Sequence, residues 1–524
     1  MTISRRNLLS YTAFGAAASL TASQGHAVPR SVAATHPRLV QPHDNAYKDL
    51  SRGANGRWLG QPEAIAIPTN AQEALQAVQS AVGHRRLAAR AGGHCYENFG
   101  TEGVALSINL RELRAIEFDE EQRTFALGAG ALLGDVYGSL YRRWGVTIPG
   151  GTCPSVGLGG HVPGGGYGAL SRRHGLIIDH LAGLEIVVVD ESGHARLEVV
   201  RREDVGPKQD LWWAHTGGGP GQLGLVTRYF FASPQRGGKP EETLPLAPSE
   251  IYQSSLRWAW ETLTEEGFKH LVSAYCDWFV QNGEVTEAHR SLFSQLRLQP
   301  VAAGGFEMMT QIDCALEGAK SVLNEFEAFV GAKCPPAAKS RIRLSWLKAT
   351  TETIAFSIPD TTRRFKGKSA YMKRGFSEQQ LNTLYRKLGD KSFRNPAMVA
   401  MISSYGGAIN TISPDATASF QRSSHLKINY IVFWDHIEDD DLNLSYLRDL
   451  YATVYARTGG VPVHDPDTAG CYIGYPDTDL QSLEWNRSNV SYKDLYWGTN
   501  LERLANVKHQ WDPLNIFTHA QGFL

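Results

Sequence analysis

The sequence predicts an α+β protein of two domains, and three observations predict it. Strand and helix patterns alternate from about residue 71 to residue 231. A segment rich in proline, glycine and charge follows, at 233–248. Beyond this segment lie longer helical patterns and further strands, which favour an antiparallel sheet with helices on one face.

In the first half, the clearest element is a helix at 71–82. Its apolar residues Leu75, Val78 and Val82 recur at spacings of three and four, and Glu73 stands in its first turn. The other elements are indicated by short apolar runs between turn residues. They are strands at 86–90, 104–108, 124–129, 185–189 and 225–231, and a helix at 132–144.

The second half contains longer periodic segments. We expect helices at 264–281, 318–330 and 378–388, and strands at 292–299, 305–313 and 426–434. The last stretch, 492–524, contains a helix near 500–510, followed by Trp511-Asp512-Pro513. The chain has no internal repeat and no low-complexity tract.

Composition excludes several classes of protein. The 524 residues carry 52 Lys and Arg against 53 Asp and Glu, so neither nucleic acid nor an anionic membrane is expected as a partner. A hydrophobic content of 42% excludes intrinsic disorder. Six cysteines without a C-x-x-C pair argue against a disulfide scaffold and a zinc site, and no metal is expected. The chain also lacks H-E-x-x-H and G-x-S-x-G motifs.

The N-terminus resembles a twin-arginine signal peptide over residues 1–27. Arg5-Arg6 precedes an apolar stretch from Leu8 to about Ala22, and the small residues Gly25 and Ala27 fit a cleavage site. The stretch is shorter than the ~20 residues that a membrane-spanning helix needs. We therefore expect an exported, soluble protein that reaches its destination already folded.

One motif is misleading. Residues 219–224 fit the dinucleotide pattern G-x-G-x-x-G, but they precede a strand, whereas the Rossmann fingerprint follows a strand and opens a helix. Pro220 also removes a backbone N–H from the turn. A nicotinamide-binding fold of that type is therefore not expected.

Two glycine-rich segments carry the functional signal. Residues 149–168 contain nine glycines, each of which costs about 1 kcal/mol in a helix relative to alanine. Such a segment is either a tight packing turn or a place where backbone N–H groups approach a ligand. The second segment, residues 90–96, places His94 after two glycines. His94 and Cys153 lack metal-ligand spacing, so they could be two nucleophiles at the ends of one planar cofactor edge.

These motifs resemble those of a known family. The Arg-x-Gly-Gly-His turn, the run from Thr152 to Gly168 and the ending Trp-Asp-Pro-x-Asn-x-Phe are similar to those of FAD-linked oxidases. These enzymes have the vanillyl-alcohol oxidase/p-cresol methylhydroxylase fold. The similarity is to their berberine-bridge-enzyme-like branch, which includes bacterial antibiotic-tailoring oxidases. The resemblance implies an FAD-binding domain at 52–234, a substrate domain at 240–478 and a C-terminal return to the first domain at 479–524.

By this resemblance, His94 bonds to the flavin 8α-methyl carbon and Cys153 to C6, which gives bicovalent FAD. Val156 matches a position that controls oxygen access to the flavin, His161 lies near flavin N1, and Gly224 and Val226 lie by the adenine. The complete set of implied cofactor-binding residues is His94, Cys153, Arg90, Ala91, Gly92, Gly93, Val156, Gly157, Gly159, Gly160, His161, Gly224, Val226 and Asn515.

The family uses a tyrosinate as the base that takes the hydroxyl proton. The resemblance places this base at Tyr472, assisted by Tyr167, with Tyr475 as the near alternative. Gly474 stands where the family has asparagine. A free phenol has a pKa of about 10, so the base needs a neighbour that stabilises its anion.

The implied function is oxidation of an alcohol or hemiacetal of a secondary metabolite or sugar, by hydride transfer to flavin N5. Molecular oxygen takes the two electrons and becomes H₂O₂. Two alternatives stay open: an exported oligosaccharide oxidase, and a non-catalytic flavin-binding protein on the same fold. An aromatic-lined groove for repeated sugars would favour the first, and a large hydrophobic pocket would favour an antibiotic-type substrate.

Overall fold

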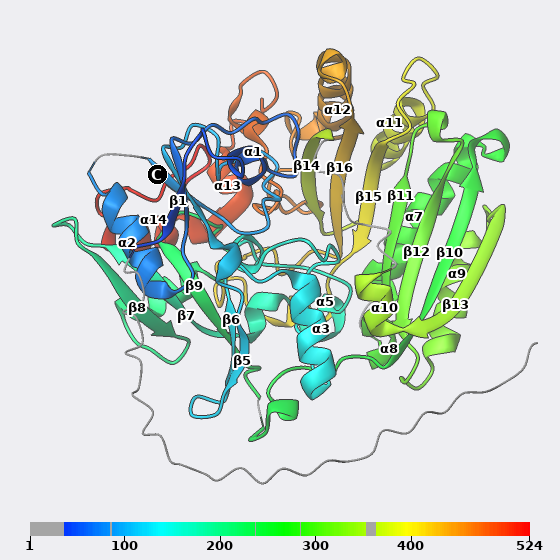
Figure 1. Ribbon diagram of the computed structural model, residues 1–524. Coiled ribbons are helices and arrows are strands. Elements are labelled where there is room, and N and C mark those ends of the chain that lie inside the picture. Colours follow the sequence, from blue (N-terminus) through cyan, green and yellow to red (C-terminus); the bar gives the residue numbers. More distant parts are fainter. Residues whose placement is uncertain (1–35, 84–85, 236, 283–284, 353–362) are drawn as a thin grey trace, which may run out of the picture. The chain divides into compact units, whose positions relative to one another are not determined.

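Three β-sheets and the helices around them make up the described part of the chain, which confirms the α+β prediction (Figure 1). The computed structural model describes residues 36–83, 86–235, 237–282, 285–352 and 363–524. The predicted signal peptide, residues 1–27, lies outside them. Residues 36–524 pack as one unit, so the domain boundaries at 234, 240 and 478 stay predictions.

The first half of the chain supplies two sheets. One has the order β1-β2-β4-β3, with β2, β4 and β3 parallel to one another and β1 antiparallel. The other has the order β5-β6-β9-β7-β8 and is antiparallel throughout. Their strands are β1 (Arg38–Val40), β2 (Ala64–Ile67), β3 (Leu87–Arg90), β4 (Leu106–Asn109), β5 (Ile116–Asp119), β6 (Thr124–Gly128), β7 (Leu181–Val189), β8 (Ala195–Arg201) and β9 (Leu225–Phe231).

The third sheet has seven antiparallel strands in the order β13-β10-β12-β11-β15-β16-β14, and the predicted linker 233–248 precedes it. In Figure 1, β14 and β16 stand at the edge that faces the first half of the chain. The strands are β10 (Glu250–Ala259), β11 (Phe293–Leu298), β12 (Gly305–Asp313), β13 (Ala338–Ser345), β14 (Arg364–Met372), β15 (Met398–Ser404) and β16 (Leu426–Trp434).

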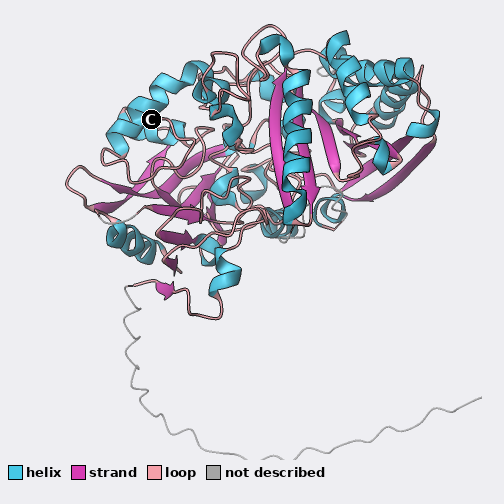
Figure 2. Cartoon of the chain, turned by 90° about the horizontal axis from the view of Figure 1, so that it is seen from above, coloured by secondary structure: helices cyan, strands magenta, loops and turns pink. Residues whose placement is uncertain are grey.

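Helices α7, α9, α11 and α12 pack along one face of the third sheet. Figure 2 shows helices lying beside the strands. The opposite face of β11, β15 and β16 is thereby left to line a site. The helices are α1 (Tyr47–Ser51), α2 (Ala71–Ala81), α3 (Leu133–Trp144), α4 (Leu158–His161), α5 (Ser171–His174), α6 (Pro207–Ala214), α7 (Glu265–Asn282), α8 (Glu287–Ser291), α9 (Ala319–Gly331), α10 (Trp346–Thr351), α11 (Glu378–Leu388), α12 (Asp440–Val454), α13 (Tyr492–Trp497) and α14 (Leu501–Trp511).

Every helix and strand that we predicted has a counterpart in the structure. The start of α2 follows the expected capping chemistry: the Asn70 side chain accepts from the backbone N–H of Glu73, whose carboxylate accepts from Thr69. In the third sheet the sequence did not predict β10, β13, β14 or β15, nor helix α12 beside it. The reason is clearest in β14, where Lys366, Lys368 and Ser369 are polar but buried.

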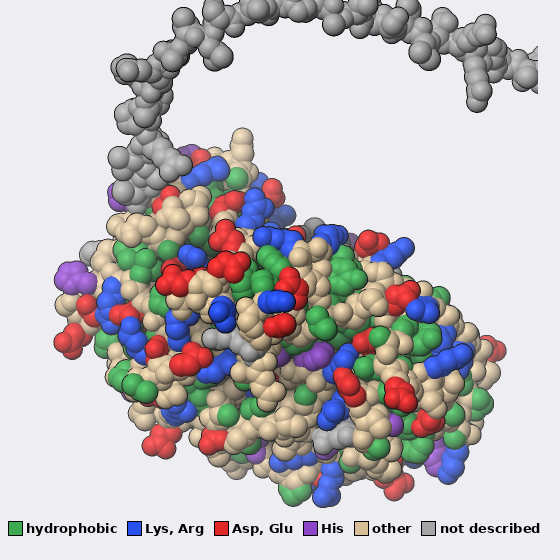
Figure 3. Space-filling model, turned by 90° about the horizontal axis from the view of Figure 1, so that it is seen from below, with side chains coloured by type: hydrophobic (Ala, Val, Ile, Leu, Met, Phe, Trp, Pro, Cys, Tyr) green, Lys and Arg blue, Asp and Glu red, His purple; other side chains and the backbone are tan. Residues whose placement is uncertain are grey.

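The face shown in Figure 3 has no dominant charge. Basic and acidic side chains are interspersed on the face shown in Figure 3, as the net charge of −1 suggests. Within the described residues, no helix is long and apolar enough to cross a membrane. The same residues contain no group of three or more His, Cys, Asp or Glu side chains that could hold a metal ion.

Candidate active site

A cavity of about 370 Å³ lies where both glycine segments face the third sheet. One wall comes from the end of β3 and the turn after it, within residues 88–100. A second wall comes from α4 and the segment before it, within residues 151–161. The opposite wall comes from β11, β15 and β16 together with residues 472–476, and Thr518 and His519 lie at one end.

The two glycine segments touch backbone to backbone. A β-carbon at Gly92 would come 2.5 Å from the nitrogen of Gly157 and 2.6 Å from the carbonyl oxygen of Ser155. A β-carbon at Gly160 would meet nothing within 4 Å. The glycines therefore allow two loops to meet while they leave backbone exposed to the cavity, as a cradle for a bound group requires.

His94 and Cys153 meet around one hydroxyl. The Nε2 atom of His94 lies 3.0 Å from Ser155 Oγ, and the Sγ atom of Cys153 lies 3.4 Å from the same oxygen. Burial, together with the nearby Arg90, lowers the pKa of His94 to about 4. The imidazole is therefore neutral at physiological pH and keeps the lone pair that a nucleophile needs.

Arg90 offers an unused donor to this cavity. One of its terminal nitrogens donates to the carbonyl of Leu50, but its buried Nε has no hydrogen-bond partner within the described residues. Burial and the neighbouring Arg111 lower the pKa of Arg90 to about 10. A buried guanidinium N–H without a partner is costly unless a ligand accepts from it. The donor and the glycine cradle together fit a dinucleotide with an anionic pyrophosphate, such as FAD.

His161 is held in a neutral form. Its Nε2 accepts from the backbone N–H of Gly151 at 2.9 Å, so its proton is on Nδ1. Burial, with a smaller contribution from Lys427, lowers the pKa of His161 to about 3. His161 can therefore offer a hydrogen bond to a bound group but not a full positive charge.

Four tyrosines surround the buried amino group of Lys427 on β16. Its Nζ atom lies 3.3 Å from the ring centroid of Tyr472, and 4.8, 4.9 and 5.8 Å from those of Tyr167, Tyr475 and Tyr371. Burial lowers the pKa of Lys427 well below its usual value and raises that of Tyr475 to about 12. The pKa of Tyr472 is also raised, first by burial and then by Tyr475.

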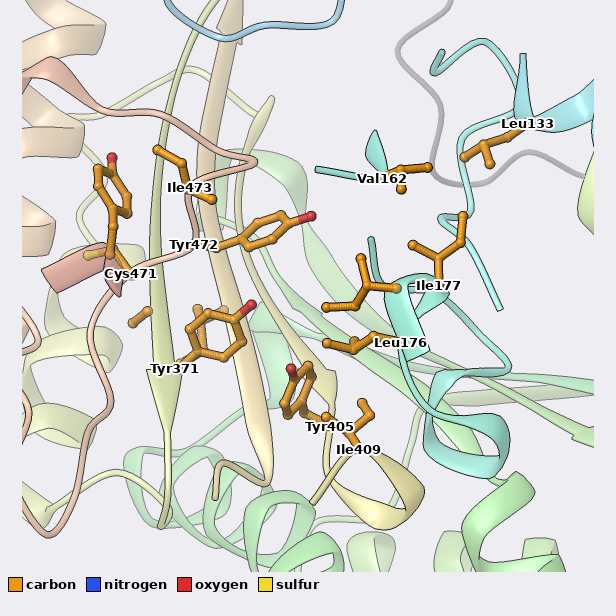
Figure 4. Close-up of a cluster of buried hydrophobic side chains, with 14 of the residues drawn as sticks. Leu133, Val162, Leu176, Ile177, Tyr371, Tyr405, Ile409, Cys471, Tyr472 and Ile473 are labelled. Carbon is orange, nitrogen blue, oxygen red and sulfur yellow. The ribbon is translucent and has the colours of Figure 1, made fainter. Parts of the chain in front are cut away.

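The cluster draws its rings from several segments, and Figure 4 shows Tyr371 and Tyr472 among them, beside Tyr405. The Tyr167 hydroxyl donates to the carbonyl of Ser404, so it is not directed at Tyr472. Lys427 is instead the basic group next to the Tyr472 ring. The expected assistance from Tyr167 is therefore not a direct hydrogen bond in this structure.

Most of the predicted site residues line the one cavity. They are Arg90, Ala91, Gly92, Gly93, His94, Cys153, Val156, Gly157, Gly159, Gly160, His161, Tyr167, Tyr472 and Tyr475. The remaining three, Gly224, Val226 and Asn515, do not line it, and their expected contacts with the cofactor stay predictions. A β-carbon at Gly224 would come 2.6 Å from the carbonyl of Val187, so strand packing accounts for this glycine. Val226 lies in β9, where it pairs with β7. Asn515 adopts a positive φ of 52° in an exposed turn.

Sequence reasoning missed the part of the site that the third sheet supplies. Gln295, on β11, and Asn429, on β16, each place a buried side-chain oxygen at the cavity, and neither oxygen has a partner in the described part of the chain. Apolar side chains from the same sheet, Val399, Ile431 and Phe433, line another part of the wall. The only signal of this wall in the sequence was that alternate residues of β16 point to opposite faces of its sheet. Without the order of the strands, the sequence does not tell which of the two faces lines the cavity.

Comparison with known proteins gives consistent matches. A family described as "FAD binding domain" matches residues 62–195, and one described as "Berberine and berberine like" matches residues 471–523. The chain is 40% identical to aclacinomycin-N/aclacinomycin-A oxidase of Streptomyces galilaeus, over 97% of this chain and 94% of that protein. It is 31% identical to hexose oxidase of Chondrus crispus, over 91% and 93% of the two chains.

A solved structure shares the whole fold. The crystal structure of a glycopeptide hexose oxidase complexed with teicoplanin superimposes with a TM-score of 0.89 at 37% identity, and covers 93% of this chain and 99% of that one. The similarity therefore extends over both glycine segments, the third sheet and the C-terminal helices.

Proposed function

Because the chain belongs to the berberine-bridge-enzyme-like family of FAD-linked oxidases, we propose that it oxidises a CH–OH carbon of a glycosylated metabolite. The chain is an FAD-dependent oxidoreductase of the two-domain vanillyl-alcohol oxidase fold. The observation that best supports oxidation of a CH–OH carbon is that His94, Cys153 and Tyr472 line one cavity.

His94 and Cys153 would hold the cofactor through two covalent bonds. They lie on separate loops and meet at Ser155, so both can reach one planar group between the loops. The unpartnered Nε of Arg90 and the backbone of Gly157–Gly160 would bind the pyrophosphate side. When bound, FAD supplies a two-electron acceptor that O₂ regenerates with release of H₂O₂.

Tyr472 would take the hydroxyl proton of the substrate. A phenol with a raised pKa is a poor base by itself, but Lys427 Nζ lies 3.3 Å from its ring centroid. Transfer of the phenol proton to the neutral amine creates a phenolate beside an ammonium and leaves the net charge of the pair unchanged. Such a pair avoids the cost of an isolated buried anion.

The cavity wall that the third sheet supplies favours a substrate that has both a sugar part and an apolar part. The unpartnered oxygens of Gln295 and Asn429 are acceptors for sugar hydroxyls. Val399, Ile431 and Phe433 offer an apolar surface that a simple oligosaccharide would not use. A glycoside with a hydrophobic aglycone can use both the hydrogen-bond acceptors and the apolar surface. This favours a glycoside substrate over an oligosaccharide. The chemical groups of Tyr472 and Lys427 favour a catalyst over a non-catalytic flavin-binding protein.

The test combines acid precipitation with a substrate panel. Flavin absorbance is measured in the pellet of the purified protein and of the His94→Ala, Cys153→Ala and double variants. We expect flavin in the pellet of the wild type and both single variants, and in the supernatant of the double variant. H₂O₂ release is then measured with free hexoses, oligosaccharides and aromatic glycosides. Flavin that never stays with the wild-type pellet contradicts covalent attachment, and no turnover of any class contradicts the oxidase.

We further propose that the protein is exported by the twin-arginine route, because Arg5-Arg6 precedes an apolar stretch with a small-residue cleavage site. The test is fractionation of the producing cell with the wild type and the Arg5→Lys/Arg6→Lys variant. We expect export of the wild type alone. Equal export of the variant would contradict the proposal.

A further inference from the structure

Six charged side chains, five of them buried, form a network behind residues 472–476, the tyrosine segment. The side chains of Glu97, Lys366, Lys368 and Asp477 are each 2% exposed. Asp479 and Arg448 extend the network towards α12. None of the six lines the cavity, but Glu97 and Asp477 lie close in sequence to His94 and Tyr475.

Lys366 is the centre of the network. Its Nζ lies 2.5 Å from Glu97 Oε1 and 2.7 Å from Asp477 Oδ1. Lys368 Nζ lies 2.7 Å from Asp477 Oδ2 and 2.7 Å from Asp479 Oδ2. Burial alone would lower the pKa of Lys366, but Asp477, Glu97 and Asp479 outweigh it and raise that pKa above its usual value. The lysine is therefore charged.

The strand that carries these lysines also contacts the site on its other face. Alternate residues of a strand point to opposite faces, so Gly367 faces away from Lys366 and Lys368. A β-carbon at Gly367 would collide with the ring of Tyr96, which explains why a glycine stands there. The strand β14 is thus in contact with Tyr96 on one face and with Glu97, the next residue, on the other.

The tyrosine segment and the residues after it also contact β14 on both of its faces. The rings of Tyr475 and Tyr96 stack at 5.0 Å with 9° between their planes. Two residues later, Asp477 binds both lysines on the opposite face. The backbone N–H of Thr478 also donates to Glu97 Oε1 at 3.3 Å. Because β14 is the last strand of its sheet, both turns can wrap around its outer edge.

We propose that Glu97, Lys366 and Asp477 are positioning residues that clamp the turn bearing His94 against the segment bearing Tyr472 and Tyr475. The inference rests on the proposed function, because it concerns the placement of the covalent attachment point relative to the base. The network contains three cations and three anions, so it has no net charge. It therefore affects the site by holding the two segments in place and not by adding charge to the cavity. The Cys153 loop has no member in the network. The clamp therefore acts on the His94 bond and not on the Cys153 bond.

The test is the site of flavin attachment in variants of the clamp. Wild type, Glu97→Gln and Gly367→Ala are purified, and mass spectrometry of peptides determines how much flavin is bonded to His94 and how much to Cys153. Gly367→Ala displaces Tyr96 without removal of a charge. We expect both variants to lower the His94-bonded fraction about tenfold while the Cys153 bond persists, since misplacement by about 1 Å can slow a reaction by up to about 100-fold.

Glu327→Gln is the matched control. Glu327 is a buried carboxylate, 2% exposed, that pairs with Lys339 and Arg341 on β13, at the opposite edge of the same sheet. It should lower the melting temperature without a change in either bond. If Glu97→Gln does not fold, the charge-balanced Glu97→Gln/Lys366→Met variant replaces it.

If the fractions of flavin bonded to His94 and to Cys153 do not change in the clamp variants, or if both fractions fall equally, the clamp proposal is wrong and the proposed function still stands. A wild-type protein without any bonded flavin instead overturns covalent attachment, and the clamp with it.

Discussion

The ring of Tyr472 lies directly over Gly474. A β-carbon at position 474 would come 2.5 Å from ring atoms Cε1 and Cζ and 2.7 Å from the hydroxyl oxygen. The absence of the family's asparagine at this position is therefore compatible with an ordered tyrosine. The bare backbone of Gly474 leaves room for a ring that folds back towards Lys427, which lies 3.3 Å from the ring centroid.

The Gly474→Ala substitution should displace this ring and lower kcat by about 10- to 100-fold, because a base must stay within hydrogen-bond reach of the proton it takes. Flavin attachment should not change, since the atoms nearest to a β-carbon at position 474 all belong to Tyr472 and none to His94 or Cys153. Peroxide release and acid-stable flavin are measured on the same preparation. A variant with normal kcat would show that the ring position over Gly474 is irrelevant to catalysis.

Ser155→Ala should reduce covalent attachment of FAD. Ser155 Oγ contacts both His94 Nε2 and Cys153 Sγ, so its loss leaves two reactive side chains without a common partner. Ser155→Thr keeps the hydroxyl and is the control. We expect about tenfold slower appearance of acid-stable flavin in the alanine variant alone, by analogy with other single positioning contacts. Equal rates in all three proteins would exclude a role for the hydroxyl.

Lys427→Met should move the activity of the enzyme to higher pH. The ammonium favours the phenolate of Tyr472, so its loss raises the pKa at which the base forms. Activity rises with pH through that pKa, and each unit of upward shift costs about tenfold in rate at neutral pH. Lys427→Arg, which places a permanent positive charge at this position, is the comparison. The rate is measured from pH 5 to pH 10, and a profile that Lys427→Met does not shift would contradict the assignment.

Local patterns predicted much of the fold, since the periodic helices and the glycine segments depend on residues close in sequence. The two walls of the cavity that carry His94 and Cys153 could therefore be predicted from the sequence. The third wall could not. Lys427 and Asn429 gain their role only because β16 lies between β15 and β14 and turns one face to the cavity.

Strand β14 also could not be predicted from local sequence patterns. Lys366 and Lys368 look like solvent-exposed residues in the sequence, so the strand was not predicted. Their partners Glu97 and Asp477 are 269 and 109 residues away, and only the folded chain brings them together. Buried ion pairs over such separations leave no periodic signal in the sequence.

Acid should destabilise the protein through its buried histidines. Burial lowers the pKa of His161 and His174 to about 3, and that of His215 and His519 to about 4. In the unfolded chain these groups have a pKa of about 6.5. As the pH falls below that value, the unfolded chain takes up protons that the folded chain does not. The free energy of unfolding therefore falls between about pH 6.5 and pH 4.

His215→Gln isolates one of these groups. His215 is buried, its Nδ1 lies 2.8 Å from the carbonyl oxygen of Leu211, and it does not line the cavity, so its replacement should leave cofactor binding unchanged. Each such histidine makes the free energy of unfolding fall by about 1.4 kcal/mol per pH unit in this range. Averaged from pH 7 to pH 5, denaturant unfolding should show a slope reduced by about 1 kcal/mol per pH unit in His215→Gln, since the unfolded histidine is mostly neutral at pH 7. The slope should be unchanged in His509→Gln, whose side chain is exposed. Equal slopes in the two variants would mean that burial does not lower the pKa of His215.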